Sequence, residues 1–559
     1  MLTSSFFCIY YCTYGTTRLA CILLINRLNF VSPSLDNRDF IILTLHFQFP
    51  TPYTLAMTIS KSFSAIPSGI TANLVTIECD STKGLPLLNI VGMANKTIEE
   101  SRERIRSAIR NSGFFYPSQD KVTINLAPAG LPKTGSYLDL AIATAILVHF
   151  QQLPADITIN TLFAGELALD GKIRPVRGIL NIIECAAANH YRRIIIPSEN
   201  TEQAALYSKN NIEIYPIKCL KEIWEIALGQ IKPKALHSHV VKNTRTDLSA
   251  PFLDQIIGQE QAKRALVIAV AGHHNVLFFG PPGTGKSMLA NTIPNLLPPP
   301  SRKEIFELTK LHSLTSDIRT PFYDRPFRSP HRSASPTSFT GGADGLPGEI
   351  TLAHLGVLYL DELPEFRRDT LESLRQPMEE RQISLSLAHQ KICYPADFML
   401  AATMNPCPCG FLGSNEKTCS CTPGAIMNYR RKLSGPLLDR IDMQINVKQQ
   451  NTSVLVKNTT NSTHEHETAK NLIQNALNKQ FNRCDKFNSA LSSVETLKYC
   501  PLDSHTQSLL DSAAKKLNLS ARSYFKTLKI ARTIADLADA TNISRQHISE
   551  ALQYRQELQ

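Results

Sequence analysis

The chain has 559 residues, of which 43% are hydrophobic and 19% are charged, and its formal net charge is +11. Because domains usually run to about 100–200 residues, this length predicts three or four domains. The composition excludes wholesale disorder and a multi-span membrane protein. The positive charge attracts polyanions, but without a located basic patch it does not identify nucleic acid as the partner.

Residues 1–56 differ in character from the rest of the chain. They are rich in Phe, Tyr, Leu, Ile and Cys, are nearly without acidic residues, and follow neither a helical nor an alternating period. The apolar stretch 6–25 is interrupted by Thr, Gly and Arg18, so it predicts neither a membrane-spanning helix nor a secretory signal. We interpret these residues as a poorly patterned extension, with the hypothesis that translation starts at Met57. N-terminal sequencing of the native protein tests this, since a peptide from residues 1–56 would contradict it.

Residues 57–228 predict a mixed α/β domain. Their pattern combines apolar runs typical of strands at 121–129, 159–169 and 193–200 with helical spacing at 98–113 and 138–150. The polar and basic stretch that follows them, 229–250, predicts a linker.

The second half of the chain predicts two further domains. Residues 251–448 contain the motifs that carry chemistry, and the polar stretch 449–468 predicts a second linker. Residues 469–559 have helical periodicity, which predicts a small all-α lid. The expected fold class is therefore a multidomain α/β protein with a helical C-terminal end.

An apolar strand at residue 276 leads directly into the pattern G-x4-GK[ST], in the strand–loop–helix context that a phosphate-binding loop requires. The expected nucleotide-binding residues are Gly280, Pro281, Pro282, Gly283, Thr284, Gly285, Lys286 and Ser287. Glycines let consecutive N–H groups and the following helix N-terminus surround the β-phosphate. Lys286 would neutralise the β- and γ-phosphates, and Ser287 would ligate magnesium. This loop predicts ATP and Mg²⁺ as cofactors.

Two carboxylates follow a four-residue apolar strand in 357-VLYLDE. At this distance after a phosphate-binding loop, Asp361 is expected to hold the magnesium through water and Glu362 to polarise the attacking water. A further apolar strand, 398-FMLAATM, ends at Asn405, which would orient water near the γ-phosphate. The alternative for Asn405 is a turn-forming residue before Pro406.

Thirteen cysteines in a chain of this length are too few for a disulfide scaffold, and four of them lie within fifteen residues. Cys407-x-Cys409 and Cys419-x-Cys421 offer four soft ligands, the number that a tetrahedral structural zinc ion takes. The C-x-C spacing is shorter than usual for zinc, so four reduced thiols in a loop are the alternative. Because this cluster directly follows the Asn405 strand, we expect it to brace that loop. Free thiols indicate a reducing compartment, so we expect a cytoplasmic protein without a membrane partner.

Together these motifs resemble AAA+ ATPases, and more closely the Mg-chelatase-like YifB/ComM family, over nearly all of residues 57–559. The resemblance rests on 84-GLPLLNIVGM, 123-TINLAPAGLPKTGS, 326-PFRSPHR, 348-GEITLAHLGVLYLDELPEF, 403-TMNPCPCG, 433-LSGPLLDRID and 520-SARSYFK. One departure is Arg332, which stands where the family pattern has a second histidine after His331.

The resemblance implies an AAA+ core with a parallel sheet, a lid of the Mg-chelatase C-terminal type, and assembly into a homo-hexamer. Arg440 is similar to the arginine finger that a neighbouring subunit inserts against the γ-phosphate. Arg522 is similar to the lid arginine that reports nucleotide state to the C-terminal helices. The alternative for each is an ordinary surface ion pair.

Residues 57–228 resemble the Lon protease domain, of ribosomal S5-type fold, in 132-PKTGSYLDLAIATAIL and 165-GELALDGKIRPVRGILN. The position of the Lon serine nucleophile corresponds to Tyr137 and that of its lysine to Leu180. Ser136 is adjacent, but no lysine stands at the matching place to activate it. We therefore predict a non-catalytic domain that contributes to DNA binding.

These expectations point to an ATP-hydrolysing motor on single-stranded or branched DNA. The family resemblance implies ComM-like branch migration, a helicase activity, on recombination intermediates during competence. Arg325, Arg328, His331 and Arg332 are candidate DNA contacts, with solvated loop charge or subunit contacts as the alternative. Two other function classes stay open: a magnesium chelatase motor subunit, which the Lon-like domain and the cysteines argue against, and a protein-remodelling ATPase.

Overall fold

The computed structural model describes residues 7–13, 16–22, 59–92, 96–133, 135–208, 211–234, 252–315, 320–342, 344–387, 391–414, 417–449 and 464–555. The chain divides into two compact units, Met1–Met57 and Thr58–Gln559. Both interdomain stretches predicted as linkers fall largely outside the described residues. The structure does describe α17 from Glu465 onward, so this helix begins inside the stretch 449–468.

The first unit contains a hairpin that the sequence reasoning missed. Strands β1 (Phe7–Thr13) and β2 (Thr16–Ile22) pair antiparallel, with Phe7 opposite Ile22. Both runs are rich in the aromatic and β-branched residues that favour strands. They lack the alternation by which a half-buried strand is recognised, which is why they went undetected.

The second unit begins with a four-stranded sheet in the order β3-β4-β6-β5, in which only β5 and β6 run parallel. Along β6, alternate residues from Val122 to Leu126 are buried, so one face of this strand packs into the core. The elements are β3 (Ser60–Ser68), β4 (Thr71–Lys83), β5 (Leu87–Val91), α1 (Lys96–Asn111), β6 (Asp120–Ala127) and α2 (Asp139–His149). The two helices predicted in this region are confirmed to within about two residues at each end.

A three-stranded parallel sheet, β11-β10-β7, follows in the same part of the chain. The strand expected over 159–169 is wrong as one element: it breaks after Phe163, where Ala164 and Gly165 separate β7 from the short hairpin strand β8. The elements are β7 (Thr161–Phe163), β8 (Glu166–Leu167), β9 (Ile173–Arg174), α3 (Ile179–Ala188), β10 (Arg193–Pro197), α4 (Thr201–Ala204), β11 (Glu213–Ile217) and α5 (Glu222–Ala227).

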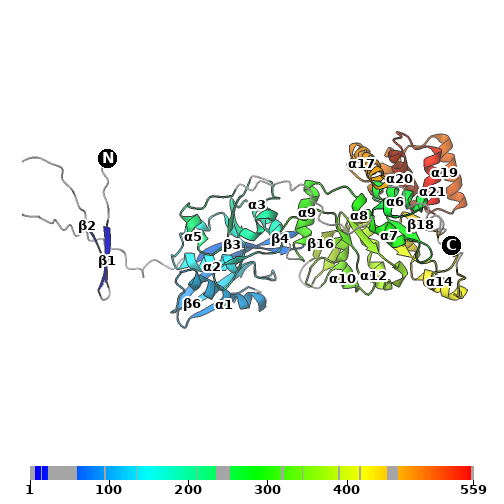
Figure 1. Ribbon diagram of the computed structural model, residues 1–559. Coiled ribbons are helices and arrows are strands. Elements are labelled where there is room, and N and C mark those ends of the chain that lie inside the picture. The colour runs from blue at the N-terminus through cyan, green and yellow to red at the C-terminus, as the bar shows by residue number, and fades with distance from the viewer. Residues whose placement is uncertain are drawn as a thin grey trace, which may run out of the picture. The chain divides into compact units, whose positions relative to one another are not determined.

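The central feature of the core is a five-stranded parallel sheet in the order β13-β14-β17-β12-β18. Figure 1 labels its edge strand β18 next to α6 (Glu260–Gly272). Its strands are β12 (Val276–Phe279), β13 (Phe327–Arg328), β14 (Val357–Leu360), β17 (Met399–Met404) and β18 (Met443–Asn446). All residues of β14 and β17 are buried, as expected for strands covered on both faces. The predicted mixed α/β class with a parallel sheet is therefore confirmed.

Helices and one hairpin surround this sheet. They are α6 (Glu260–Gly272), α7 (Lys286–Asn291), α8 (Ile293–Leu296), α9 (Arg302–His312), α10 (Pro336–Thr340), α11 (Glu349–Leu352), α12 (Arg368–Ser373), α13 (Arg375–Glu380), β15 (Gln382–Ser386), β16 (Lys391–Pro395), α14 (Pro423–Arg431) and α15 (Gly435–Leu438). Strands β15 and β16 pair antiparallel apart from the main sheet.

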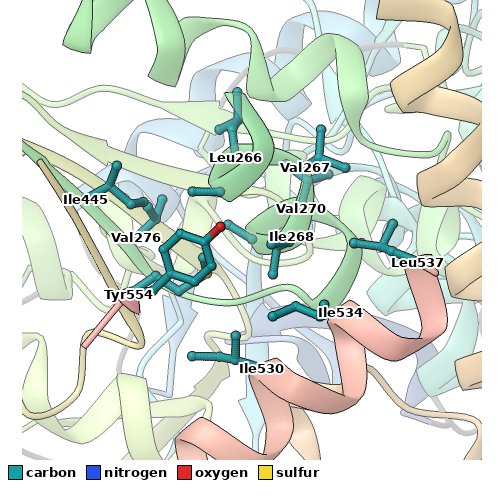
Figure 2. Packing of buried hydrophobic residues seen from close by; sticks show 14 of the residues in the cluster. Leu266, Val267, Ile268, Val270, Val276, Ile445, Ile530, Ile534, Leu537 and Tyr554 are labelled. Carbon is teal, nitrogen blue, oxygen red and sulfur yellow. The ribbon is translucent and has the colours of Figure 1, made fainter. Parts of the chain in front are cut away.

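The C-terminal part of the chain is helical, and it shares one hydrophobic core with the sheet. Ile268 of α6 lies toward Ile530 and Ile534 of α20 (Figure 2), and the same cluster includes Val276 of β12 and Ile445 of β18. The helices are α17 (Glu465–Cys484), α18 (Ser493–Tyr499), α19 (Ser504–Lys516), α20 (Ala521–Leu537) and α21 (Arg545–Gln553). Helix α6 thus joins the C-terminal helices to the sheet through a continuous apolar contact.

Among the helices that the structure describes, none combines the length and the apolar character needed to cross a lipid bilayer.

The buried strand β12 yields a stability prediction. Phe278 is fully buried, whereas Phe115 is 63% exposed. We expect Phe278→Ala to lower the free energy of unfolding of the core by about 3–5 kcal/mol, because it removes an aromatic ring from a packed interior. Phe115→Ala is the matched control and should change it by less than about 0.5 kcal/mol. Urea denaturation of both variants measures the difference, and equal effects would contradict the position of β12 in the core.

Candidate nucleotide site

The turn after β12 has the backbone geometry of a phosphate cradle. Gly285 has φ +88° and caps α7, a conformation that residues with a side chain rarely adopt. Gly280 is required for a different reason: a Cβ atom there would lie 2.3 Å from the carbonyl oxygen of Val447. The predicted loop therefore has the shape that leaves its N–H groups and the start of α7 available to an anion.

Lys286 is the first residue of α7 and is 8% exposed. Its Nζ donates to the carbonyl oxygens of Gly280 at 2.8 Å and Pro281 at 2.7 Å, and to Oδ1 of Asn405 at 3.2 Å. Burial lowers the pKa of Lys286 to about 8, while the carboxylates of Asp361 and Glu362 act in the opposite direction. The buried ammonium thus lies where phosphate oxygens would replace carbonyl oxygens as its partners.

Asp361 is surrounded by hydroxyl groups at the end of β14. Its Oδ1 accepts from Ser287 at 3.2 Å and from Tyr359 at 2.8 Å, and it also accepts from Thr403. Thr403 in turn accepts from the backbone N–H of Glu362 at 3.1 Å. Adjacent carboxylate and hydroxyl oxygens are the ligands that Mg²⁺ prefers, so Ser287 and Asp361 fit a magnesium site.

Thr403 and Tyr359 were missed by the sequence reasoning. Thr403 is the one hydroxyl residue in the apolar run 398-FMLAATM, two positions before Asn405. A buried polar residue needs a partner, and the strand neighbouring β17 offers Asp361. A single polar residue in an otherwise apolar strand was the signal in the sequence that could have identified Thr403.

Glu362 is held by a basic residue in this structure. Oε2 of Glu362 lies 2.5 Å from Nη1 of Arg332, and the side chains of these two residues are 42% and 56% exposed. The backbone at Glu362 is left-handed, with φ +54°, which turns its side chain away from the line of β14. Arg332, the residue that departs from the family pattern, is thus in direct contact with Glu362, the expected catalytic carboxylate.

The other candidate DNA contacts have different surroundings. Arg325 is 9% exposed and binds Glu304 at 3.0 Å and the carbonyl oxygens of Pro298 and Leu355, so its proposal as a DNA contact is wrong. Each of its three guanidinium nitrogen atoms has a partner inside the fold.

Arg328 and His331 lie nearer the surface. Arg328 forms a two-bond pair with Glu349, both bonds at 2.7 Å. His331 is exposed and contacts Ser333 at 2.7 Å. Of the four candidates, Arg332 has the most accessible charge that is also coupled to the nucleotide site.

Arg440 and Arg522 come together away from the phosphate loop. Both bind Oε1 of Glu379, Arg440 at 2.7 Å. Arg522 lies within the first turn of α20, because α20 begins at Ala521. Glu379 was not singled out from the sequence, where a lone glutamate in a helix carries no signal.

The sheet register places the backbone of Arg440 at the opposite end of β12 from the glycine-rich loop of its own chain. Arg440 precedes β18, and Val276 at the start of β12 is paired with Met443 at the start of β18. The carbonyl of Arg440 accepts from Nδ2 of Asn275, one residue before β12. The phosphate loop begins at the other end of this four-residue strand, which spans about 13 Å.

In the Lon-like region, Ser136 and Lys133 each bind a partner other than one another. The Ser136 hydroxyl donates to Glu166, and Lys133 donates to the carbonyl of Pro128. Leu180, at the position of the Lon lysine, is fully buried in an apolar cluster.

The four clustered cysteines converge on one point; we call Cys407, Cys409, Cys419 and Cys421 the thiol cluster. All four sulfur atoms lie within 4.8 Å of one another, and three of the pairs are 3.4–3.6 Å apart. Sulfur atoms around a tetrahedral zinc ion with bonds of about 2.3 Å are about 3.8 Å apart. The thiols are free rather than disulfide-bonded, so this geometry fits a zinc ion.

Comparison with known proteins matches most of the chain. Family models of the ChlI subunit of magnesium chelatase match residues 77–200 and 252–455, and a model of its C-terminal region matches residues 463–555. The uncharacterized protein YifB of Escherichia coli is 41% identical over 505 residues, covering 89% of this chain and 97% of that protein. The competence protein ComM of Haemophilus influenzae is 41% identical over 507 residues, covering 89% and 98%.

The chain belongs to the YifB/ComM family of Mg-chelatase-like AAA+ proteins. The Lon protease of Aquifex aeolicus is also similar, at 28% identity over 173 residues that cover 29% of this chain and 21% of that protease. The family resemblance drawn from the motifs is thus confirmed, and a partial similarity to Lon accompanies it.

The buried lysine gives a pH prediction. Phosphate favours the charged ammonium, so nucleotide binding raises the pKa of Lys286 above its value of about 8 in the free protein. Affinity is therefore greatest below about pH 8 and should fall as the pH rises, by up to about tenfold per unit. Titration of a fluorescent ATP analogue between about pH 7 and pH 9.5 measures this slope. Lys286→Ala should bind weakly without the slope, and a flat wild-type profile would contradict the assignment.

Proposed function

We propose that this protein is an ATP-hydrolysing ring motor that acts on DNA and drives branch migration of recombination intermediates. The observation that carries the ATPase proposal is the convergence of Lys286, Ser287, Asp361 and Asn405 at the ends of three neighbouring parallel strands. In this proposal Lys286 holds the phosphates, Ser287 and Asp361 hold the magnesium, and Asn405 orients water. Glu362 is the base that accepts a proton from the attacking water.

Three observations support DNA as the substrate on which the motor acts. The relative from Haemophilus influenzae is named a competence protein, and competence is the uptake of transforming DNA. The net charge of +11 favours a polyanionic partner. Arg332 is an exposed cation paired with the proposed base Glu362, so DNA that binds Arg332 would release Glu362 for hydrolysis.

The first experiment uses protein starting at Met57, a synthetic four-way DNA junction and ATP. We expect the native protein to convert the junction into duplexes, and Glu362→Gln to bind the junction while losing about 100- to 10,000-fold in hydrolysis, since it removes the general base. A gel assay follows the junction, and a phosphate-release assay follows hydrolysis.

A second candidate function is favoured by the matches to the ChlI subunit: an ATPase that remodels a protein partner, as a chelatase motor subunit does. The same assay separates the two. ATP hydrolysis that is stimulated by a protein partner and indifferent to every DNA tested would favour remodelling over branch migration.

Arg440 and Arg522 support the ring. Because both lie on Glu379 at the amino end of the sheet, we propose that they act together on the nucleotide of a neighbouring subunit. We propose that the ring is a closed homo-hexamer, in which each subunit supplies these arginines to its neighbour. Glu379 would keep the two guanidinium groups side by side until a neighbour's phosphates compete for them.

Mixing two inactive variants tests this. We expect Arg440→Ala to lose about a thousandfold or more in kcat, as removal of an arginine finger does, and Lys286→Ala to bind nucleotide only weakly and to be inactive on its own. Mixed rings pair the intact phosphate loop of the first variant with the intact Arg440 of the second, so hydrolysis should return. If Arg440 acts within its own chain, mixing restores nothing.

Arg332 provides a separate prediction about coupling. An exposed ion pair contributes about 0–1 kcal/mol, so Arg332→Ala should raise basal hydrolysis by at most about fivefold, by releasing Glu362. It should also reduce the stimulation by DNA. Arg367→Ala, which removes an exposed pair with Asp369, is the matched control. Unchanged basal and stimulated rates in Arg332→Ala would show that Arg332 does not control hydrolysis.

A further inference from the structure

The thiol cluster begins two residues after Asn405. Strand β17 ends at Met404, Asn405 follows, and Cys407 is fully buried. Asn405 accepts a hydrogen bond from Lys286 at 3.2 Å. A ligand that holds Cys407 therefore also restrains, across one intervening residue, the amide that contacts the phosphate-binding lysine.

A second contact joins the two loops directly. Gly410 has φ +86°, and a Cβ atom at this position would lie 2.9 Å from Cδ of Pro282 and 3.9 Å from Cγ of Asn405. The turn between the first two cysteines and the rest of the cluster thus packs against the phosphate loop with no room for a side chain. Pro282 has little freedom of its own, because its ring fixes φ.

The cluster has the character of a rigid anchor. The backbone N–H of Cys409 donates to Sγ of Cys421 at 3.4 Å, which connects the two C-x-C arms. Without an ion, two short arms joined by the nine residues 410–418 depend on weak thiol contacts to stay together. Four thiolates bound to one thiophilic divalent cation would fix the arms outright.

We propose that the thiol cluster binds zinc and that this ion is a positioning element of the nucleotide site, acting through Asn405 and the Gly410–Pro282 contact. The inference rests on the proposed ATPase function. The zinc takes no part in the reaction: it holds the loop 405–421 so that Asn405 faces Lys286 and the phosphate loop keeps its shape. Loss of the ion should then lower kcat, while the backbone cradle of 280–287 keeps most of its affinity for ATP.

The test compares two double variants of the full chain. Cys419→Ser with Cys421→Ser removes one arm of the cluster, whereas Cys393→Ser with Cys484→Ser removes two thiols outside it. We expect elemental analysis to find one zinc per chain in the wild type and in the control pair, and none in the cluster variant. We also expect kcat to fall by about tenfold to a hundredfold in the cluster variant, as small misplacements of positioning groups do, with ATP affinity changed less than about threefold.

Gly410→Ala tests the contact between Gly410 and Pro282 independently of zinc binding. It leaves all four cysteines in place, so it should keep its zinc, yet its new methyl group displaces Pro282 or the turn. We expect it to reproduce the fall in kcat. This variant also keeps the proposal falsifiable if the cluster variant fails to fold.

Amide hydrogen exchange gives a readout that does not require ATP hydrolysis. Exchange in 280–287 and 404–410 should accelerate in the cluster variant and stay at the wild-type rate in the control pair. Wild-type protein without zinc, or with disulfides in the cluster, would overturn the metal site. Zinc loss that leaves exchange in 280–287 and kcat unchanged would overturn the coupling. If exchange in 280–287 depends on the zinc but the wild type hydrolyses no ATP, the proposed ATPase function is refuted. The coupling between the thiol cluster and the loop then still stands.

Discussion

The position of β17 between β12 and β14 is the constraint on which the candidate nucleotide site depends. Parallel strands end at the same edge of a sheet, so the side chains that follow these three strands are brought together although they are far apart in sequence. Thr403 accepts from the backbone of Glu362 and donates to Asp361, and Asn405 accepts from Lys286. Each of these bonds crosses from β17 to a neighbouring strand end.

The charges of the site all have partners within the single chain. Lys286 donates to carbonyl oxygens, Glu362 is paired with Arg332, and Arg440 and Arg522 share Glu379. A nucleotide, a polyanion or a neighbouring subunit would have to displace one of these partners in order to bind. Exchange of the exposed Arg332–Glu362 pair costs little free energy, whereas Lys286 makes its bonds in a buried setting.

The elements that the sequence predicted well were those with a strong local signal. The buried strand 357-VLYL and the glycine pattern after β12 each determine their own backbone conformation, through apolar burial and through glycine's access to positive φ. The expected strand over 159–169 was wrong because Gly165 interrupts it, and the hairpin β1–β2 was missed because its residues do not alternate. Arg325 was misjudged because a loop arginine gives no local sign that Glu304 will bury it.

The sequence by itself determined the phosphate loop, the carboxylates after β14, the four clustered cysteines and the family, because each depends on residue type at short spacing. Only the tertiary structure decided which distant groups meet: Arg332 on Glu362, two arginines on Glu379, and Gly410 against Pro282. These contacts depend on strand order and on the packing of loops from separate parts of the chain. Residue spacing along a chain carries no record of such contacts, because they are set by the burial of the shared core rather than by any local preference.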